Sequence, residues 1–326
     1  MVQRIILLLL SLGVVGLAVA WILSAPDPFN AEEIANLPGG QAQAGETVFW
    51  AGGCASCHAA PKASGEEKLK LGGGLELKTP FGVFVAPNIS PDPSSGLGNW
   101  SLADFASAMK RGVRPDGAHY YPAFPYPSYS RMTDQDVSDL WAFINTLPPV
   151  STRAADHRLS FPFNIRRVLG FWKLLYLNDE MVVSVPDDDP VLQRGRYLVE
   201  ALGHCGECHT PRNPLGGPDN SAWLGGGPSP EGNETIPNIS PHKNGIGDWT
   251  LVDLGPGLSS EGRFFIISVI LGLVGWPTLA RRVRTHLLTE RNQEYVLAAQ
   301  LCGAKPGHVI RRHLLPSFTS YIIVDL

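Results

Sequence analysis

The sequence is poor in charge, in cysteine and in catalytic patterns, and each shortage narrows what the protein can do. Only 17% of its 326 residues are charged, and the formal net charge is −4. This balance lacks the basic surface of a nucleic-acid-binding protein, so no nucleic-acid partner is expected. The sequence contains no nucleophile–base pair and no pair of carboxylates at a spacing typical of a catalytic site, so we expect no catalytic site in this chain. The many glycines (35) and prolines (28) favour compact, loop-rich domains.

Four of the five cysteines fall in two Cys-x-x-Cys-His motifs, which are the attachment signature of a c-type haem. The thiols form thioethers to the porphyrin, and the histidine that follows becomes the proximal iron ligand. A disulfide, a thioredoxin-like redox pair or a zinc site built from both cysteine pairs are the other interpretations. Paired zinc-ribbon motifs lie about 15–20 residues apart, whereas most of the chain separates these two. The sequence predicts two covalent haem c groups and an electron-transfer protein, with the attachment residues Cys54, Cys57, His58, Cys205, Cys208 and His209.

The N-terminus carries an uncharged apolar run of 19 residues, Ile5–Leu23, preceded by Arg4. That length can span a membrane, and the arginine predicts an N-terminus on the cytoplasmic side. We expect a signal anchor over 1–24. A cleaved signal peptide competes with it, because Ala18-Val19-Ala20 has the pattern of a cleavage site. Either way, the motifs are exported to the compartment in which c-type haem is attached.

An internal repeat surrounds the motifs, which are offset by 151 positions. Pro87–Pro91 recurs as Pro237–Pro241, and Gly96–Phe105 recurs in related form as Gly245–Leu254. Repeats of this kind indicate duplicated structural units. We therefore predict a mainly α-helical protein with two cytochrome c-like domains, 40–150 and 190–254, joined by a linker over 151–189.

Helices are expected before each motif, over Gly45–Ala51 and Arg194–Leu202. Ser101 with Asp104 forms a capping box that opens a helix through Lys110. A second box, Thr133 with Asp136, opens a helix that runs to about Leu147, with its apolar residues on one face.

The repeat stops after Leu254, so the second domain is truncated. The next segment, 255–326, contains an apolar stretch over 264–280 that is followed by three arginines. Its length and flanking charge predict a transmembrane helix whose far end is cytoplasmic, and a buried core helix is the competing interpretation.

A distal haem ligand is usually a methionine or a histidine from a loop after the motif. In the first domain Met132 is the favoured candidate and His119, in a loop that could be exposed, is the second. Met109 lies inside a predicted helix and is expected to be core. No methionine follows Met181, and His242 is expected to be a solvated loop residue, so the second haem is predicted to be five-coordinate or weakly held.

From Gln41 to Asp253 the chain resembles membrane-anchored di-haem c-type cytochromes, which are related to cytochrome subunits of alcohol and gluconate dehydrogenases. The resemblance implies helical cytochrome domains on the periplasmic face of a bacterial inner membrane. It also implies that they pass electrons from a dehydrogenase toward quinone or a terminal oxidase. One departure is Phe124, where many relatives have the methionine that is their distal ligand. Besides both motifs, the residues that carry the resemblance are Thr79–Gly82, Pro87–Pro91, Tyr121–Tyr126 and Phe161–Asn164.

From Arg263 to Leu326 the chain resembles a permease of dipeptide and oligopeptide ABC transporters. In that family the stretch corresponding to 290–316 is a cytoplasmic helix-turn-helix that docks on the ATPase subunit, and Cys302 would be a reduced thiol there. The resemblance raises two competing functions, a permease fragment and a chimeric fusion of a cytochrome with a permease. A lone span cannot enclose a polar path, which weighs against transport. The matching residues are Gly272–Pro277, Glu294–Ala299, Gly303–Ala304 and His313–Pro316.

Overall fold

Two crossing helices form the centre of the fold, α3 (Ala42–Ala51) and α7 (Asp134–Ile144). They approach closely because Gly45 has no side chain at the crossing. A Cβ at this position would lie 1.9 Å from the carbonyl oxygen of Asp139 in α7. The glycine therefore sets how tightly the helix that leads into the first motif packs on its partner.

The computed structural model describes residues 2–229, 234–249, 305 and 307. Residues 1–248 form one compact unit, and the second unit begins at residue 249. The C-terminal segment predicted over 255–326, with its expected span and helix-turn-helix, thus lies almost wholly outside the described residues.

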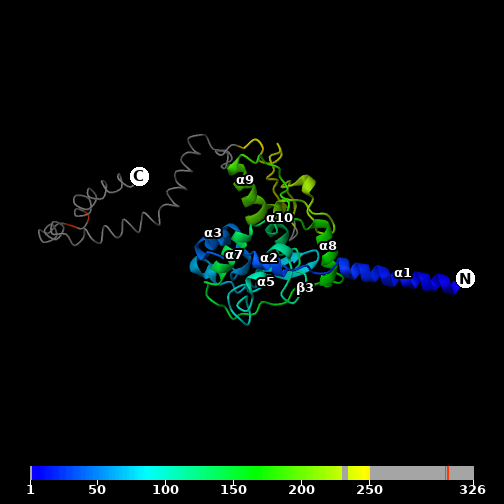
Figure 1. Ribbon diagram of the computed structural model, residues 1–326. Helices are drawn as coiled ribbons and strands as arrows, with labels where there is room; N and C mark the ends of the chain where they lie inside the picture. The colour runs from blue at the N-terminus through cyan, green and yellow to red at the C-terminus, as the bar shows by residue number, and fades with distance from the viewer. Residues whose placement is uncertain (1, 230–233, 250–304, 306, 308–326) are drawn as a thin grey trace. The chain divides into compact units, whose positions relative to one another are not determined.

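The elements of the first unit follow the order seen in Figure 1. Up to the end of the first repeat they are α1 (Val2–Leu23), α2 (Ala31–Ala35), α3, α4 (Cys54–His58), the 3-10 turn Gly65–Leu69, β1 (Glu76–Thr79), β2 (Gly82–Val85), α5 (Leu102–Arg111), α6 (Tyr126–Tyr129) and α7. The later elements are β3 (Arg158–Leu159), the 3-10 turn Arg166–Val168, α8 (Leu169–Tyr176), α9 (Pro190–Tyr197), the π turn Leu198–Leu202, α10 (Cys205–His209), the 3-10 turn Asn220–Ala222, β4 (Gly227–Pro228) and β5 (Thr235–Ile236).

Two small antiparallel sheets accompany the helices. β2 lies between β1 and β3, and β4 pairs with β5. Because β3 belongs to the predicted linker, that linker packs directly on the first domain. The side chain of Asn88 also holds it there by donating to the carbonyl oxygens of Val150 (2.6 Å) and Thr152 (2.8 Å).

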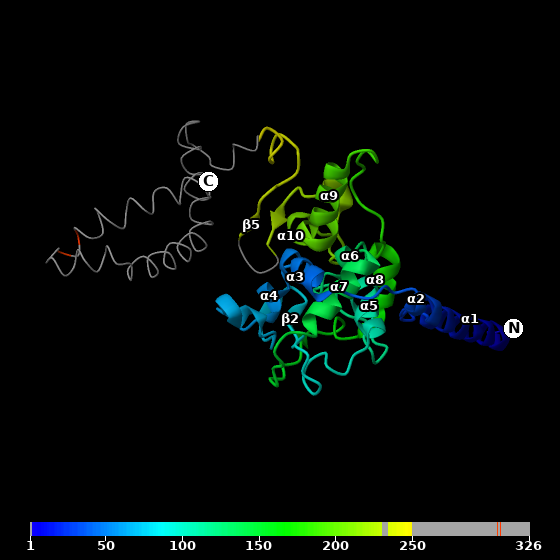
Figure 2. The ribbon, with the colours of Figure 1, turned by 60° about the vertical axis from the view of Figure 1, so that its left-hand side comes forward.

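The core lies around the α3–α7 crossing, and it includes residues from both repeats. α9 and α10 lie on one side of this helix pair (Figures 1 and 2). Leu202, from the turn before the second motif, is buried in the same cluster as residues of the first repeat. Other buried members are Val48, Phe49, Leu71, Phe105, Met109, Tyr129, Met132, Val137, Leu140, Phe143 and Ile144.

The two predicted N-terminal caps, at Ser101 and at Thr133, are both present, but the capping box at Thr133 is incomplete. Ser101 and Asp104 form the full capping box at α5. At α7, Thr133 Oγ1 accepts from the Asp136 amide (3.1 Å), but the return bond is absent. The hydroxyl of Tyr197 takes its place, because it accepts from the Thr133 amide (3.1 Å) and contacts the Asp136 carboxylate. The second repeat thereby completes a cap in the first.

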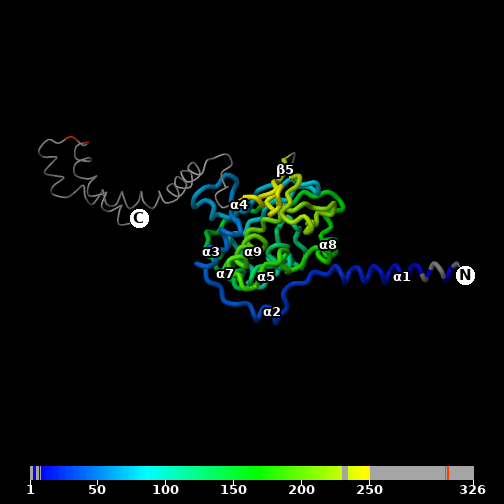
Figure 3. Tube along the Cα trace, turned by 90° about the horizontal axis from the view of Figure 1, so that it is seen from above, coloured from blue at the N-terminus to red at the C-terminus, as the bar shows by residue number. Residues whose placement is uncertain are grey.

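The N-terminal helix α1 extends away from the other elements of the first unit (Figure 3). It carries exposed apolar side chains, among them Leu17 and Trp21. Across the part of the chain that the structure describes, no helix is both long and apolar enough to cross a membrane. The anchor over 1–24 stays a prediction, and the span over 264–280 lies outside the described residues.

Candidate functional site

Each motif forms one short helix, α4 in the first repeat and α10 in the second. In α4, Cys54 and Cys57 are three positions apart and so share a face, and His58 comes directly after them. The residue before each helix is left-handed, namely Gly53 (φ 62°) and His204 (φ 39°). The two repeats thus present their cysteines and histidine through the same local backbone.

A proline carbonyl orients the histidine of each motif. His58 Nδ1 lies 2.8 Å from the carbonyl oxygen of Pro87, and His209 Nδ1 lies 2.9 Å from that of Pro237. A carbonyl oxygen only accepts, so each Nδ1 carries the proton and each Nε2 keeps its lone pair. This is the form that binds a metal, and the bond raises the basicity of the ligand. Sequence reasoning noted the repeated Pro-Asn-Ile-Ser-Pro turn but missed this role.

The carbonyl is held by the rest of the repeated turn. Asn88 Oδ1 accepts from the Ser90 amide at 2.8 Å, and Asn238 makes the same bond to Ser240. The Gly73 amide donates to the carbonyl oxygen of His58 at 2.7 Å. Gly73 has φ 71°, and a Cβ there would lie 2.6 Å from the Pro87 oxygen.

Gly226 repeats this arrangement in the second domain. It has φ 74°, its amide donates to the carbonyl oxygen of His209 (2.7 Å), and a Cβ would lie 2.8 Å from the Pro237 carbonyl carbon. The repeat seen in the sequence is therefore a repeat of the whole histidine-orienting geometry.

Desolvation sets the charge of the first motif. It raises the pKa of the Cys54 thiol to about 12, so this thiol is neutral near neutral pH. It lowers the pKa of His58, although the Pro87 carbonyl partly opposes it. A neutral histidine with a free Nε2 suits an iron ligand.

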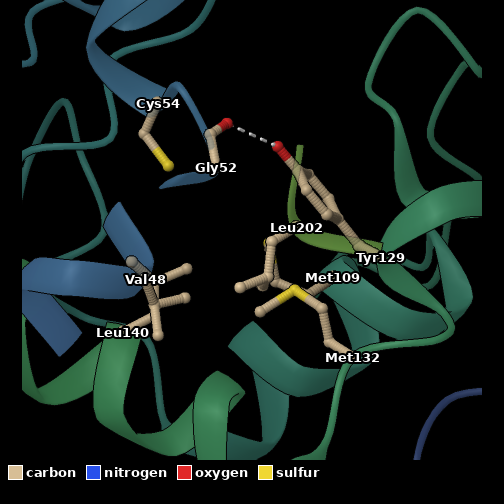
Figure 4. Close-up of a pocket in the computed structure, with 8 residues that line it drawn as sticks. All are labelled: Val48, Gly52, Cys54, Met109, Tyr129, Met132, Leu140 and Leu202. Atoms are coloured by element: carbon tan, nitrogen blue, oxygen red, sulfur yellow. Dashed lines mark hydrogen bonds between the residues drawn. The ribbon is translucent and has the colours of Figure 1, made fainter. Parts of the chain in front are cut away.

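An apolar cavity adjoins the first motif (Figure 4). Met109 and Met132 both line it together with Cys54, so the favoured distal candidate lies beside the motif. The hydroxyl of Tyr129 donates to the Gly52 carbonyl oxygen at 3.2 Å at the cavity edge. The role of Met132 as a ligand stays a prediction. The remaining lining residues are Val48, Leu140 and Leu202.

His119 differs from the expectation of an exposed loop residue. It is 2% exposed, and its Nε2 lies 3.0 Å from the Ser24 carbonyl oxygen. The chain that leaves α1 packs over it, which no local sequence pattern shows. The ring of Phe124 packs against those of Tyr120 and Tyr129, with centroids 5.4 Å and 5.9 Å apart.

A direct link joins the two motifs. His204, which precedes Cys205, has its Nε2 3.2 Å from the Gly52 carbonyl oxygen. Its ring also meets that of Tyr129 edge-on, with centroids 5.5 Å apart. The signal that could have revealed this contact is that His204 occupies the repeat position of Gly53, where a left-handed backbone favours glycine.

No three His, Cys, Asp or Glu side chains within residues 2–229 and 234–249 come together as a metal-ion cluster. Two separate attachment helices, each with an oriented histidine, fit two c-type haems.

Comparison with known proteins agrees with this geometry. A cytochrome c family model matches residues 42–148. A di-haem c-type cytochrome of Cereibacter sphaeroides is 55% identical over 247 residues, which cover 76% of this chain and 81% of that protein. The chain belongs to the di-haem c-type cytochromes. Covalently bound haem c is the cofactor of this di-haem cytochrome, and its predicted role as an electron-transfer protein rather than an enzyme is confirmed.

A cytochrome subunit of fructose dehydrogenase from Gluconobacter japonicus is 42% identical over 213 residues. These cover 64% of this chain but only 43% of that subunit, so the di-haem cytochrome spans less than half of its length.

The C-terminal resemblance is confirmed as well. The family of binding-protein-dependent transport system inner membrane components matches residues 235–326. A dipeptide transport system permease of Bacillus subtilis is 42% identical over 76 residues, which cover 23% of this chain and 22% of that protein. Within the described part of this match, the turn at Pro237 still follows the cytochrome geometry.

Proposed function

We propose that this di-haem cytochrome takes electrons from a dehydrogenase and passes them to the respiratory chain, toward quinone or a terminal oxidase. The relatives support the donor, because several of them are named as cytochrome subunits of dehydrogenases, including those for fructose, alcohol and gluconate. The observation that carries the proposal is the pair of histidines, each with Nδ1 bound to a proline carbonyl.

When bound, haem c supplies an iron that alternates between the ferric and ferrous states. The chain's residues hold it in place. The paired cysteines of α4 and α10 would attach it, and His58 and His209 would offer Nε2 to the iron. Met132 would offer its sulfur to the iron of the first site, because it lines the cavity beside Cys54.

We also propose that the cytochrome works on the periplasmic face of the inner membrane, anchored by residues 1–24. The apolar run ahead of the motifs and the exposed apolar surface of α1 support this placement. A span over 264–280 would return the chain to the cytoplasm. There, the segment 290–316 would be available to an ATPase subunit.

The haem-attachment proposal is tested by expressing the full chain with a cytochrome c maturation system. Covalent haem staining and a reduced-minus-oxidised spectrum should show two haems per chain. The orienting geometry is tested separately with Gly73→Ala, whose new Cβ would push on the Pro87 carbonyl. We expect a shift in the reduction potential of the first haem, because the hydrogen bond to Nδ1 sets the basicity of the histidine ligand.

Gly74→Ala is the matched control, because Gly74 also has a positive φ (102°) but a Cβ added there would meet nothing within 4 Å. Equal reduction potentials of the first haem in the two variants would contradict the role assigned to the Pro87 carbonyl. Absence of covalent haem would contradict the electron-transfer proposal itself.

A second candidate is a chimeric chain, in which a truncated cytochrome is fused to a permease fragment. The permease match over 235–326 favours it, as does the loss of the repeat after Leu254. Sequencing genomic DNA across the codons for residues 240–270 tests it. One uninterrupted reading frame in independent isolates supports a real fusion, whereas a frame break there would separate the two parts.

A further inference from the structure

Helix α8 exposes several large apolar side chains to solvent, on the face that a soluble protein normally makes polar. Phe171, Leu174 and Leu175 are 39%, 61% and 66% exposed, and Val168, just before the helix, is 52% exposed. A surface helix ordinarily turns its apolar stripe to the core and its polar residues to water. A contiguous apolar face of this kind indicates an interaction site.

The inward face of α8 explains why the helix does not rotate to bury these residues. Trp172 is buried and donates from Nε1 to the Leu215 carbonyl oxygen at 3.0 Å. Lys173 donates to the carbonyl oxygens of Arg111 (2.6 Å) and Gly112 (2.8 Å) at the end of α5. These bonds fix the rotation of α8, so its apolar face stays outward.

The C-terminal end of α1 contacts the start of α8. A Cβ at Gly170 would lie 2.4 Å from the Ser24 carbonyl oxygen, so the two backbones touch. The guanidinium of Arg167 donates from Nε to Ser24 Oγ at 3.1 Å and lies 4.1 Å over the ring of Trp21. Figures 1, 2 and 3 all place α8 at the face of the unit from which α1 leaves, and in Figure 1 its axis runs across that of α1.

The charges at this junction favour a phospholipid surface as the occupant. Arg166 and Arg167 form no salt bridge with any carboxylate in the described part of the chain. Both guanidiniums donate to backbone carbonyls, Arg166 to that of His119 (2.9 Å) and Arg167 to that of Trp21. Arginines that lack a salt bridge beside an apolar face attract anionic headgroups. Trp21, 65% exposed at the end of α1, is the residue type that gathers at the membrane–water interface.

We propose that α8 lies in the plane of the membrane, with Val168, Phe171, Leu174 and Leu175 inserted at the boundary between headgroups and acyl chains. This inference rests on the proposed anchoring by α1. Because α8 is bonded to the end of α5, its contact with lipid holds the first cytochrome domain in one orientation above the bilayer.

The test uses the full haem-loaded chain in vesicles of phosphatidylglycerol and phosphatidylcholine that carry a photoactivatable diazirine in their acyl chains. After illumination, mass spectrometry locates labelled peptides. We expect label in α1 and α8 and none in α9, although Val191 of α9 is 78% exposed. The double variant Leu174→Glu/Leu175→Glu should lose the α8 label and keep its haem spectrum, whereas Val191→Glu should label like the parent chain.

The outcomes separate the two proposals. Label in α1 with none in α8 overturns the placement of α8 while the anchor stands. Label in α8 that persists in Leu174→Glu/Leu175→Glu also overturns it, because the contact with lipid then does not depend on the apolar face. Absence of label from both helices contradicts the anchor and the placement of α8 together.

Discussion

The contact between the two repeats at His204 can be tested by its effect on stability. His204→Ala removes the bond to the Gly52 carbonyl oxygen and the edge-on contact with Tyr129. The first is worth about 1 kcal/mol and the second about 1 kcal/mol. Alanine keeps the strain of the left-handed backbone, so we expect the free energy of unfolding to fall by about 2 kcal/mol.

His204→Gly separates the contact from the strain. Glycine loses the same two interactions, but it relieves a left-handed conformation that disfavours other residues by about 1 kcal/mol. The expected net loss is therefore about 1 kcal/mol, as if the second repeat took the residue found at Gly53 in the first.

The assay is denaturant unfolding of the haem-loaded chain, followed by circular dichroism. The order of stability should be parent, then His204→Gly, then His204→Ala. A glycine variant more stable than the parent would show that the contacts of His204 are worth less than the strain that glycine relieves, which refutes the magnitude assigned to them. Equal losses for glycine and alanine would refute the strain assigned to the left-handed backbone.

Three further predictions concern other parts of the unit. Burial lowers the pKa of Lys173 from 10.5 to about 7. Between about pH 7 and about pH 10.5 the folded chain therefore binds fewer protons than the unfolded chain. The free energy of unfolding should therefore rise between about pH 7.5 and about pH 9.5, by up to about 2 kcal/mol, and Lys173→Met should flatten this rise in a series of denaturant titrations. Gly45→Ala should destabilise the chain by more than about 2 kcal/mol, seen as a lower thermal midpoint, because the methyl group collides with the Asp139 carbonyl; an unchanged midpoint would contradict the tight crossing. Met132→Ala should shift the spectrum and lower the reduction potential of the first haem in a redox titration, since methionine ligation raises it. An unchanged spectrum removes Met132 as the ligand.

The chemistry of the site could be predicted from the sequence because it depends on short, local patterns. The cysteines and histidine of each motif are contiguous, and the capping box at Ser101 spans three positions. In the structure each motif folds as one short helix, and the capping box at Ser101 forms as predicted.

The parts that sequence reasoning missed depend on backbone groups and distant segments. The carbonyl of Pro87 orients His58 across 29 positions, and a backbone acceptor leaves no residue type to recognise. His119 is buried because the Ser24 carbonyl, 95 positions away, covers it. Tyr197 replaces the return bond of the Thr133 cap from the other repeat. Such contacts emerge only from the packing of the whole unit.

Counting the haems bound to each chain tests the central claim most directly. Intact-mass spectrometry of the mature protein should give two covalently bound haems per chain. Cys205→Ala/Cys208→Ala should give one, and adding Cys54→Ala/Cys57→Ala should give none. If the double variant of the second motif keeps the haem count of the parent chain, the second motif does not hold haem and the account of two equivalent histidine-orienting sites is wrong.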